Sequence, residues 1–318
     1  MKTGFLNSSV NSPDCLPDSR QSFIFAAFAQ GYRNHSGENL PGFNRDFQSR
    51  LAIAAATIDP VLSHFGFSGE TFENDELRTQ YLTYIYSSTA AGILRKLKFR
   101  PVLTAGYSMG IYAALFDAGS ITFASGLELI QIAYQSMRDS LPHDHFSMGT
   151  IIGLSGNDLT DLIGNHNLEA SISNRNASHS FVVSGYRGDV RKLLELAAAE
   201  GALHTRDLGV SLPYHSRLLE QGSLDFARKI RAIGFQPAAN PVVSLVDQKI
   251  LQTPEALRNE VVRNLCCPLN WLNTQEVMVQ NGVNMFVECG PSNGLVKNSK
   301  FVEGNYRFYT LGNLPPAE

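Results

Sequence analysis

The chain alternates between short apolar runs and longer stretches in which apolar residues recur every three or four positions. The runs 22–27 and 101–105 are typical of buried parallel strands, whose two faces are both covered. The longer stretches are typical of helices with one apolar stripe. They span 46–65, 75–97, 111–116 and 123–140. This alternation predicts an α/β fold with a parallel sheet.

The pattern changes to shorter elements between Ser147 and Ser211. Strand-like and helix-like segments follow one another there in the order βαββαβ, which is the order of a ferredoxin-like unit. The expected strands are 150–154, 169–174, 180–184 and 203–208, and the expected helices are 158–164 and 189–200. Longer elements then return, with helices at 216–233, 254–265 and 270–280 and a strand at 283–288.

We therefore expect two structural units. A large α/β-hydrolase-like catalytic domain with a parallel sheet is formed by 1–146 and 210–318. A small ferredoxin-like subdomain over 147–209 is inserted into it.

Composition excludes several function classes. Of the 318 residues, 43% are hydrophobic, and the formal net charge is −3, which is ordinary for a globular protein with a large core. Lysine and arginine do not cluster, so we expect neither a nucleic-acid partner nor a membrane-surface partner. No apolar run approaches the ~20 residues of a spanning helix, and the polar start of the chain does not resemble a secretory signal. A cytoplasmic protein is the expectation.

The four cysteines show no C-x-x-C spacing, and the two adjacent ones are poorly placed to form a disulfide. They are Cys15, Cys266, Cys267 and Cys289. This usage is typical of a reducing compartment. His143 and His145 flank Asp144, but no further residue stands at a ligand spacing, so we expect no metal site.

The segment Gly106-Tyr107-Ser108-Met109-Gly110 gives the strongest chemical signal. It matches the G-x-S-x-G nucleophile elbow and lies between an expected strand and an expected helix. Two glycines allow the tight turn that holds the serine Oγ beside the amides of a helix N-terminus. An ordinary helix-capping serine is the structural alternative. The context favours a nucleophile.

A serine nucleophile needs a base, and His215 is the best candidate. It follows Leu212-Pro213-Tyr214, at the point where the small unit returns the chain to the large one. A histidine there is well placed to face a cleft between the two units. A solvent-exposed loop histidine is the alternative interpretation, and His204, inside an expected strand, is the second candidate base.

Four motifs in order resemble those of one family. They are G-x-S-x-G at 106–110, N-x-N before V-V-x-G at 174–185, a proline-containing segment ending in histidine at 212–215, and E-x-G-P at 288–291. The sequence resembles the malonyl-CoA:acyl carrier protein transacylase family, which includes free-standing acyltransferases of fatty acid and polyketide synthases. The resemblance extends from Phe23 to about Lys297.

The resemblance implies a mechanism. Ser108 takes an acyl group from a thioester, and His215 is first general base and then general acid. A backbone carbonyl orients the histidine in this family, and the matching position is Asn264. The oxyanion hole uses the amide of Met109 and one from the loop after the first strand, where the ungapped match is Phe28. A shifted match places Gln30 there instead.

The resemblance also implies the substrates and partners. The family has no permanently bound cofactor, and its substrates are thioesters of coenzyme A or of phosphopantetheine. Acyl carrier protein is the expected partner.

The departures from the family pattern bear on the substrate. Malonyl-specific members carry an arginine that pairs with the substrate carboxylate, and the equivalent position here is Ala133. A buried carboxylate without a counter-ion is unfavourable by several kcal/mol. We therefore expect a non-carboxylated acyl group. Arg138 lies five residues on and is a weak substitute.

Aromatic residues flank both expected catalytic residues. Tyr107 replaces the usual family histidine, and Tyr214 precedes His215. We assign these two, with Ala133, Met137 and Asn176, to the acyl pocket, although aromatic residues near strand ends are often core residues.

Three functions compete with acyl transfer. One is an acyl-thioester hydrolase that uses the same serine, and another is a non-catalytic relative that only binds a carrier protein. An α/β-hydrolase esterase is the third, but its acidic residue and its HGGG-type loop are not evident.

Overall fold

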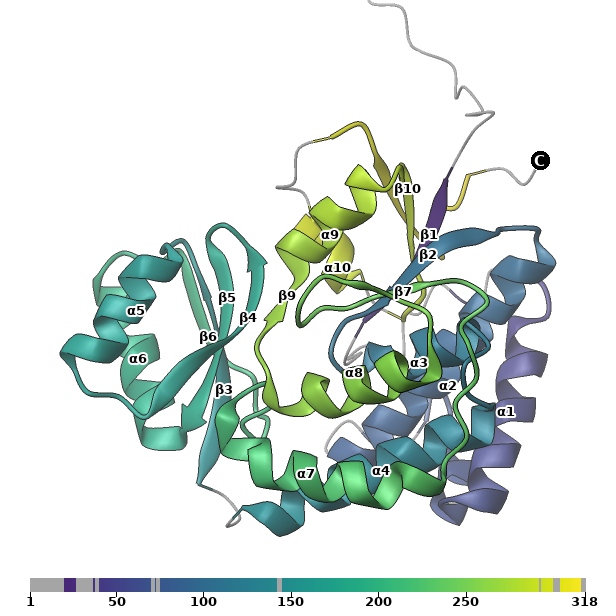
Figure 1. Cartoon of the computed structure of the whole chain (residues 1–318), viewed down its shortest axis with the longest axis horizontal. Coiled ribbons are helices and arrows are strands. Elements are labelled where there is room, and N and C mark those ends of the chain that lie inside the picture. Colours follow the sequence, from purple (N-terminus) through teal and green to yellow (C-terminus); the bar gives the residue numbers. More distant parts are fainter. Residues whose placement is uncertain are drawn as a thin grey trace, which may run out of the picture.

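The computed structural model describes residues 20–26, 37, 40–69, 72, 75–141, 145–291, 293–299 and 304–315. A large body of helices and strands occupies most of the view in Figure 1, and a smaller unit that carries α5 and α6 lies beside it. Each of the two parts has its own sheet.

The sheet of the large body has the strand order β11-β10-β1-β2-β7-β8. Neighbouring strands are parallel, except that β8 is antiparallel to β7. The strands are β1 (Gln21–Phe25), β2 (Pro101–Gly106), β7 (Val242–Val243), β8 (Ile250–Leu251), β10 (Met285–Glu288) and β11 (Arg307–Thr310). The predicted α/β class with a parallel sheet is confirmed.

Alternate residues of the central strands pack into different cores. Phe23 and Phe25 of β1 belong to the larger cluster, whereas Ile24 belongs to a second cluster with Ala105 and Trp271. Because successive side chains of a strand point to opposite faces, both faces of the sheet are covered by helices. This double burial explains why the first two strands read as continuous apolar runs.

Helices of the larger cluster lie on one face, and α9 and α10 lie on the other (Figure 1). The helices of the large body are α1 (Phe43–Thr57), α2 (Glu76–Lys96), α3 (Gly110–Asp117), α4 (Phe123–Ser140), α7 (Glu220–Lys229), α8 (Pro254–Cys266), α9 (Trp271–Gln280) and α10 (Gly294–Asn298).

The expected single helix over 46–65 is wrong. α1 ends at Thr57, and a 3₁₀ helix follows at Pro60–His64. Proline disfavours helical backbone in the residue before it, and Asp59 is extended with φ −147°. The Asp59 side chain instead accepts a hydrogen bond from the Val61 amide at 3.0 Å and starts the new turn.

The expected helix over 216–233 is also divided. Only Glu220–Lys229 is α-helical, and 3₁₀ turns at Arg217–Leu219 and Ile230–Ala232 flank it. Such turns are common at the ends of α-helices.

The small unit has the predicted element order. It consists of β3 (Phe146–Ile152), α5 (Gly156–Asn165), β4 (Ala170–Ala177), β5 (Ser180–Tyr186), α6 (Arg187–Ala199) and β6 (His204–Asp207). The strand order is β6-β3-β5-β4, and these neighbours are antiparallel, as in a ferredoxin-like sheet. A fifth strand, β9 (Leu269–Asn270), adds parallel to β4 from the large body. Because β9 has only two residues, the sequence shows no alternation from which this strand could be predicted.

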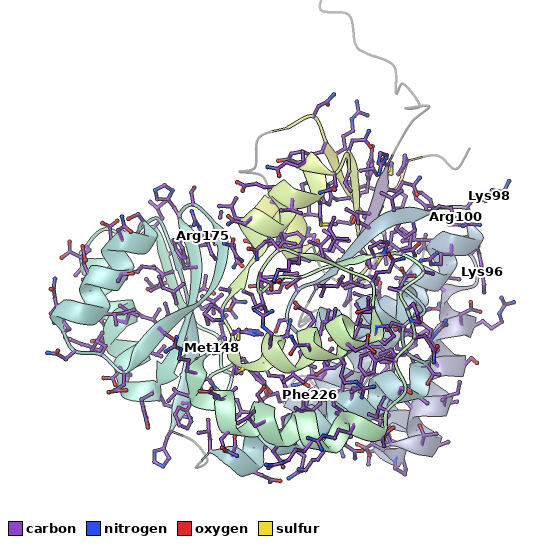
Figure 2. All side chains as sticks on the ribbon, viewed as in Figure 1. Lys96, Lys98, Arg100, Met148, Arg175 and Phe226 are labelled. Atoms are coloured by element: carbon purple, nitrogen blue, oxygen red, sulfur yellow. The ribbon has the colours of Figure 1, made fainter. Side chains whose placement is uncertain are left out.

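We propose that 147–209 is a domain of its own between 1–146 and 210–318. A separate hydrophobic cluster, which includes Ile151, Phe181 and Leu193, supports this division. The other side of the small sheet joins the large core, since Met148 of β3 and Phe226 of α7 belong to one cluster. Figure 2 labels both side chains near the junction.

Candidate active site

The turn between β2 and α3 is as tight as the elbow pattern requires. A Cβ on Gly106 would lie 2.3 Å from the Ile111 Cα, and one on Gly110 would lie 2.1 Å from the Phe25 carbonyl oxygen. Neither position accepts a larger residue without a shift of the backbone. Ser108 lies between them with φ +53°, a left-handed conformation that is strained for a residue with a side chain.

His215 lies against this serine. Its Nε2 is 2.7 Å from Ser108 Oγ, and its Nδ1 is 2.5 Å from the Asn264 carbonyl oxygen. The His215 amide also donates to the Leu265 carbonyl at 2.9 Å, so the end of α8 holds both the ring and the backbone. His215 has φ +60°, which the contacts with α8 keep in place.

The hydrogen bonds assign a tautomer. A carbonyl oxygen only accepts, so Nδ1 carries the proton and Nε2 presents its lone pair to the Ser108 hydroxyl. Burial lowers the pKa of His215 to about 4, against a smaller raising contribution from the bond to Asn264. The ring is therefore neutral at physiological pH and ready to accept a proton.

This burial predicts an unusual pH dependence. A histidine with its ordinary pKa of 6.5 would lose about tenfold of its basic form between pH 7.5 and pH 5.5. We expect the kcat/KM of Ser108 acylation to change little over that range, and to fall only as pH approaches 4, where His215 takes up a proton. Stopped-flow acylation at fixed ionic strength tests this, and an acid limb near pH 6.5 would contradict it.

One of the expected oxyanion donors, the amide of Met109, lies in the described structure. Met109 directly precedes α3, and its amide has no acceptor among the hydrogen bonds between described residues. An amide at that position faces the oxygen of a carbonyl attacked by Ser108. Phe28 and Gln30, the two candidates for the second donor, lie outside the described ranges.

The other residues assigned to the acyl pocket lie in two places. Ala133 and Met137 are buried on α4 within the large core. A Cβ on Gly222 of α7 would lie 3.0 Å from Met137 Cε, so the methionine packs between α4 and α7. Tyr107 and Asn176 meet on the other side, where the small sheet approaches the elbow.

Tyr107 joins the elbow to the small sheet. Its hydroxyl donates to Asn176 Oδ1 of β4 at 2.8 Å, and its ring contacts Trp271 edge-on with centroids 6.3 Å apart. Burial raises the pKa of Tyr107, so the phenol remains a neutral donor. Trp271 was not among the predicted site residues.

The sequence also did not reveal which residue holds the histidine loop, the segment 211–215 that ends in His215. The carboxylate of Glu76, at the start of α2, accepts hydrogen bonds from the Tyr214 hydroxyl at 2.9 Å and from Ser211 Oγ at 3.1 Å. Gln80 donates to the same phenol at 3.4 Å. Glu76 and Tyr214 are 138 positions apart, and no motif connects them. Burial raises the pKa of Glu76, partly offset by its two donors.

We expect Glu76→Ala to slow acylation of Ser108 by about tenfold, because the loss of a part-buried hydrogen bond worth about 1–2 kcal/mol loosens the segment that holds His215. Tyr214→Phe, which removes the same bond from the other side, should act similarly, and the double variant should be no slower than either single one. Additive losses would contradict a shared role.

Other sequence candidates lie elsewhere. His204 is exposed on the edge strand β6, and it is His215 that contacts Ser108. His143 and Asp144 are not among the described residues, nor is Cys15; within the described ranges no three potential metal ligands cluster. The remaining cysteines are free thiols. None of the described helices is both long and apolar enough to cross a membrane.

We compared the sequence with protein-family models and with curated proteins. No protein-family model matches the chain. It is 28% identical over 264 residues to the malonyl CoA-acyl carrier protein transacylase of Staphylococcus aureus, covering 80% of this chain and 85% of that protein. The transacylase of Bacillus subtilis is 27% identical over 275 residues, with 82% and 83% covered. The chain is a relative of the malonyl-CoA:acyl carrier protein transacylases. The resemblance drawn from its motifs is thereby confirmed.

Solved transacylase structures share the fold. The malonyl CoA-acyl carrier protein transacylase of Coxiella burnetii superimposes with a TM-score of 0.81 at 25% identity, covering 92% of this chain and 94% of that one. A malonyl-transacylase solved in complex with a type II polyketide synthase acyl carrier protein gives 0.83 at 25% identity, with 93% and 97% covered. These transacylase relatives are acyltransferases, the enzyme class that the motifs predicted.

Proposed function

We propose that the chain is an acyltransferase that moves an uncharged acyl group from a coenzyme A or carrier-protein thioester to the phosphopantetheine thiol of an acyl carrier protein. The main observation behind this proposal is the 2.7 Å contact between Ser108 Oγ and Nε2 of a neutral His215. The other ring nitrogen, Nδ1, is bonded to the Asn264 carbonyl. The similarity to transacylases, one of them in complex with an acyl carrier protein, supports the choice of partner.

In the first half-reaction, Ser108 Oγ attacks the thioester carbonyl carbon while His215 Nε2 takes the hydroxyl proton. Negative charge develops on the carbonyl oxygen, where the Met109 amide donates a hydrogen bond. Such a donor contributes ~3 kcal/mol to transition-state stabilisation. The carbon–sulfur bond then breaks, and the imidazolium returns its proton to the departing thiolate. The product is an ester on Ser108.

In the second half-reaction, the acceptor thiol gives its proton to His215 and attacks the ester carbonyl. The carbon–oxygen bond breaks, and Ser108 recovers its proton from the imidazolium. No resident cofactor takes part in this scheme, because the thioester carries the activated acyl group itself.

The acyl group is proposed to be uncharged because of α4. Ala133 stands where the family resemblance places the carboxylate-binding arginine, and it is 2% exposed. Arg138 already has partners: it donates to the Tyr134 hydroxyl at 3.3 Å, its guanidinium is 5.7 Å from the centre of that ring, and its charge stabilises the carboxylate of Glu76. The relatives named above use malonyl groups, so this is a departure from them.

The test is a transfer assay with acetyl-, butyryl- and octanoyl-CoA and holo-acyl carrier protein, followed by mass spectrometry of both proteins and of free acid. Acyl transfer to the phosphopantetheine at a rate above background hydrolysis is expected. Release of free acid without acyl-carrier product would replace the proposal with a thioester hydrolase. No acylated Ser108 with any donor would leave only a carrier-binding role.

A further inference from the structure

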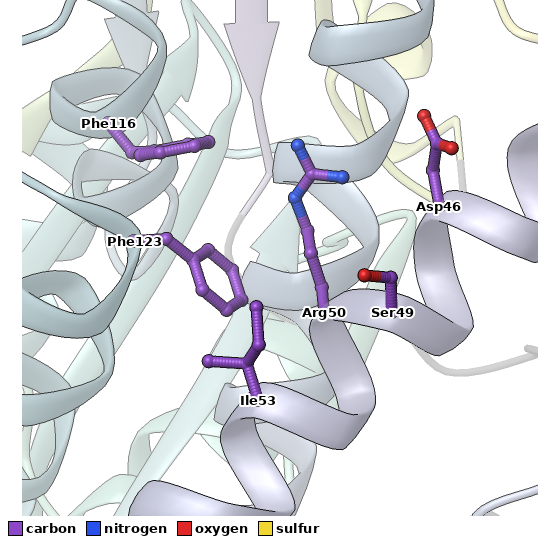
Figure 3. A pocket seen from close by; sticks show the side chains of 6 residues that line it. All are labelled: Asp46, Ser49, Arg50, Ile53, Phe116 and Phe123. Carbon is purple, nitrogen blue, oxygen red and sulfur yellow. The ribbon is translucent and has the colours of Figure 1, made fainter.

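A hollow of about 310 Å³ opens on the surface far from the catalytic pair. It lies between α1 and the corner that joins α3 to α4. Ser108 precedes the start of α3, whereas Phe116 is at its last turn, so the eight-residue helix separates the hollow from the nucleophile by ~12 Å. The lining residues are Asp46, Ser49, Arg50, Ile53, Phe116 and Phe123 (Figure 3).

Arg50 dominates this hollow. Figure 3 shows its side chain rising from α1 between Phe116 on one side and Asp46 on the other. The guanidinium carbon is 6.0 Å from the centre of the Phe116 ring and 5.8 Å from that of Phe123. A Cβ on Gly92 of α2 would lie 3.3 Å from its Nη2, so a glycine inside a helix leaves room for the charged group.

This guanidinium has no carboxylate partner within the described part of the chain. The nearest acid on its own helix, Asp46, pairs instead with Lys96 and with Arg45 at 3.3 Å. Burial lowers the pKa of Arg50, which still remains charged. The charge of Asp46 favours the charged form of Arg50 from a distance, but no carboxylate of the described residues is in ion-pair contact with the guanidinium. A partly desolvated charge without such a contact is unfavourable, and an anion that enters the hollow would reduce that penalty.

The surroundings select the kind of anion. Two phenyl rings and the partly exposed Ile53 offer apolar contact beside the charge, and the Ser49 hydroxyl offers a further donor. The carboxylate of Asp46 repels a doubly charged group more than a singly charged one.

We propose that this hollow is a second binding site, which takes a small monocarboxylate with a flat or apolar body and holds its carboxylate on Arg50. The site is separate from the acyl-transfer centre, and the proposal does not depend on the proposed function.

Benzoate is the probe, because it combines one carboxylate with a flat ring. We expect it to shift the δ-methyl resonance of Ile53, assigned with Ile53→Val, in a saturable manner, and to bind the full-length protein in calorimetry. Arg50→Gln should weaken binding about tenfold or more, as expected for the loss of a charge-assisted contact. Arg206→Gln, which removes an exposed arginine of β6 in the small unit, is the control and should bind as the unmutated protein does.

Benzyl alcohol and inorganic phosphate complete the design. The first lacks the charge and the second lacks the apolar body, so both should bind more weakly than benzoate. Equal binding of benzoate by Arg50→Gln, or no Ile53 shift at millimolar benzoate, would overturn the proposal and leave Arg50 with a packing role only. If Arg50→Gln fails to fold, Arg50→Lys replaces it. An unchanged affinity of Arg50→Lys for benzoate, with no shift of the Ile53 resonance, would mean that benzoate binds elsewhere and would overturn the proposal. Ser108→Ala should leave the Ile53 shift intact, which separates this site from the catalytic one.

Discussion

Ser108→Ala is expected to abolish acyl-enzyme formation. Intact-protein mass spectrometry after incubation with an acyl-CoA should show no adduct, and the transfer rate should fall by at least about 10³-fold, since loss of the nucleophile in serine enzymes removes most of the catalysis. The physical reason is that the elbow serine presents its oxygen to the basic nitrogen of His215 at 2.7 Å.

The fold should tolerate this change well. Alanine at Ser108 keeps the backbone of the elbow, whose glycines and not its hydroxyl fix the turn. Ser87→Ala on α2, another buried serine, is the matched control and should be acylated normally. An unchanged adduct in Ser108→Ala would show that another residue is the nucleophile.

The second large effect is expected from Ala133→Arg. An arginine at this position of α4 would supply the bidentate partner that a substrate carboxylate needs, so malonyl labelling of Ser108 should rise by about two orders of magnitude relative to acetyl labelling. The comparison is made with the malonyl and acetyl donors present together, so that they compete for the same serine and the ratio of the two adducts gives the selectivity.

Packing around Ala133 makes a control necessary. The residue is buried within the large core, and a longer side chain must find space there. Ala133→Met adds similar length without charge and should reduce labelling by both donors without favouring malonyl. A folded Ala133→Arg protein with the unmutated preference would contradict the assignment of this position to the acyl pocket.

The parts of the fold that could be predicted are those with long repeated patterns. The helix over 123–140 matches α4 at both ends, because Thr122 caps its first turn and the apolar stripe continues to its end. The six elements of the small unit were expected in the correct order. Strands β7, β8 and β9 have two residues each, too short for any periodicity to appear.

The catalytic pair could be proposed from local motifs, but its supports could not. The elbow and the histidine segment each carry their own signal, whereas Glu76 reaches Tyr214 only because α2 passes the histidine loop in the folded chain. The same applies to Trp271, which meets Tyr107 through the packing of α9. Contacts between segments distant in sequence depend on tertiary packing, which no single-sequence pattern records.

The most direct test of the account is labelling of the unmutated protein with an equimolar mixture of malonyl-, acetyl- and butyryl-CoA, read by intact-protein mass spectrometry and by mapping of the modified peptide. The account predicts an acetyl or butyryl ester on Ser108 and little malonyl ester. Preferential malonyl labelling of Ser108 would contradict the uncharged substrate, and labelling at another residue would contradict the mechanism.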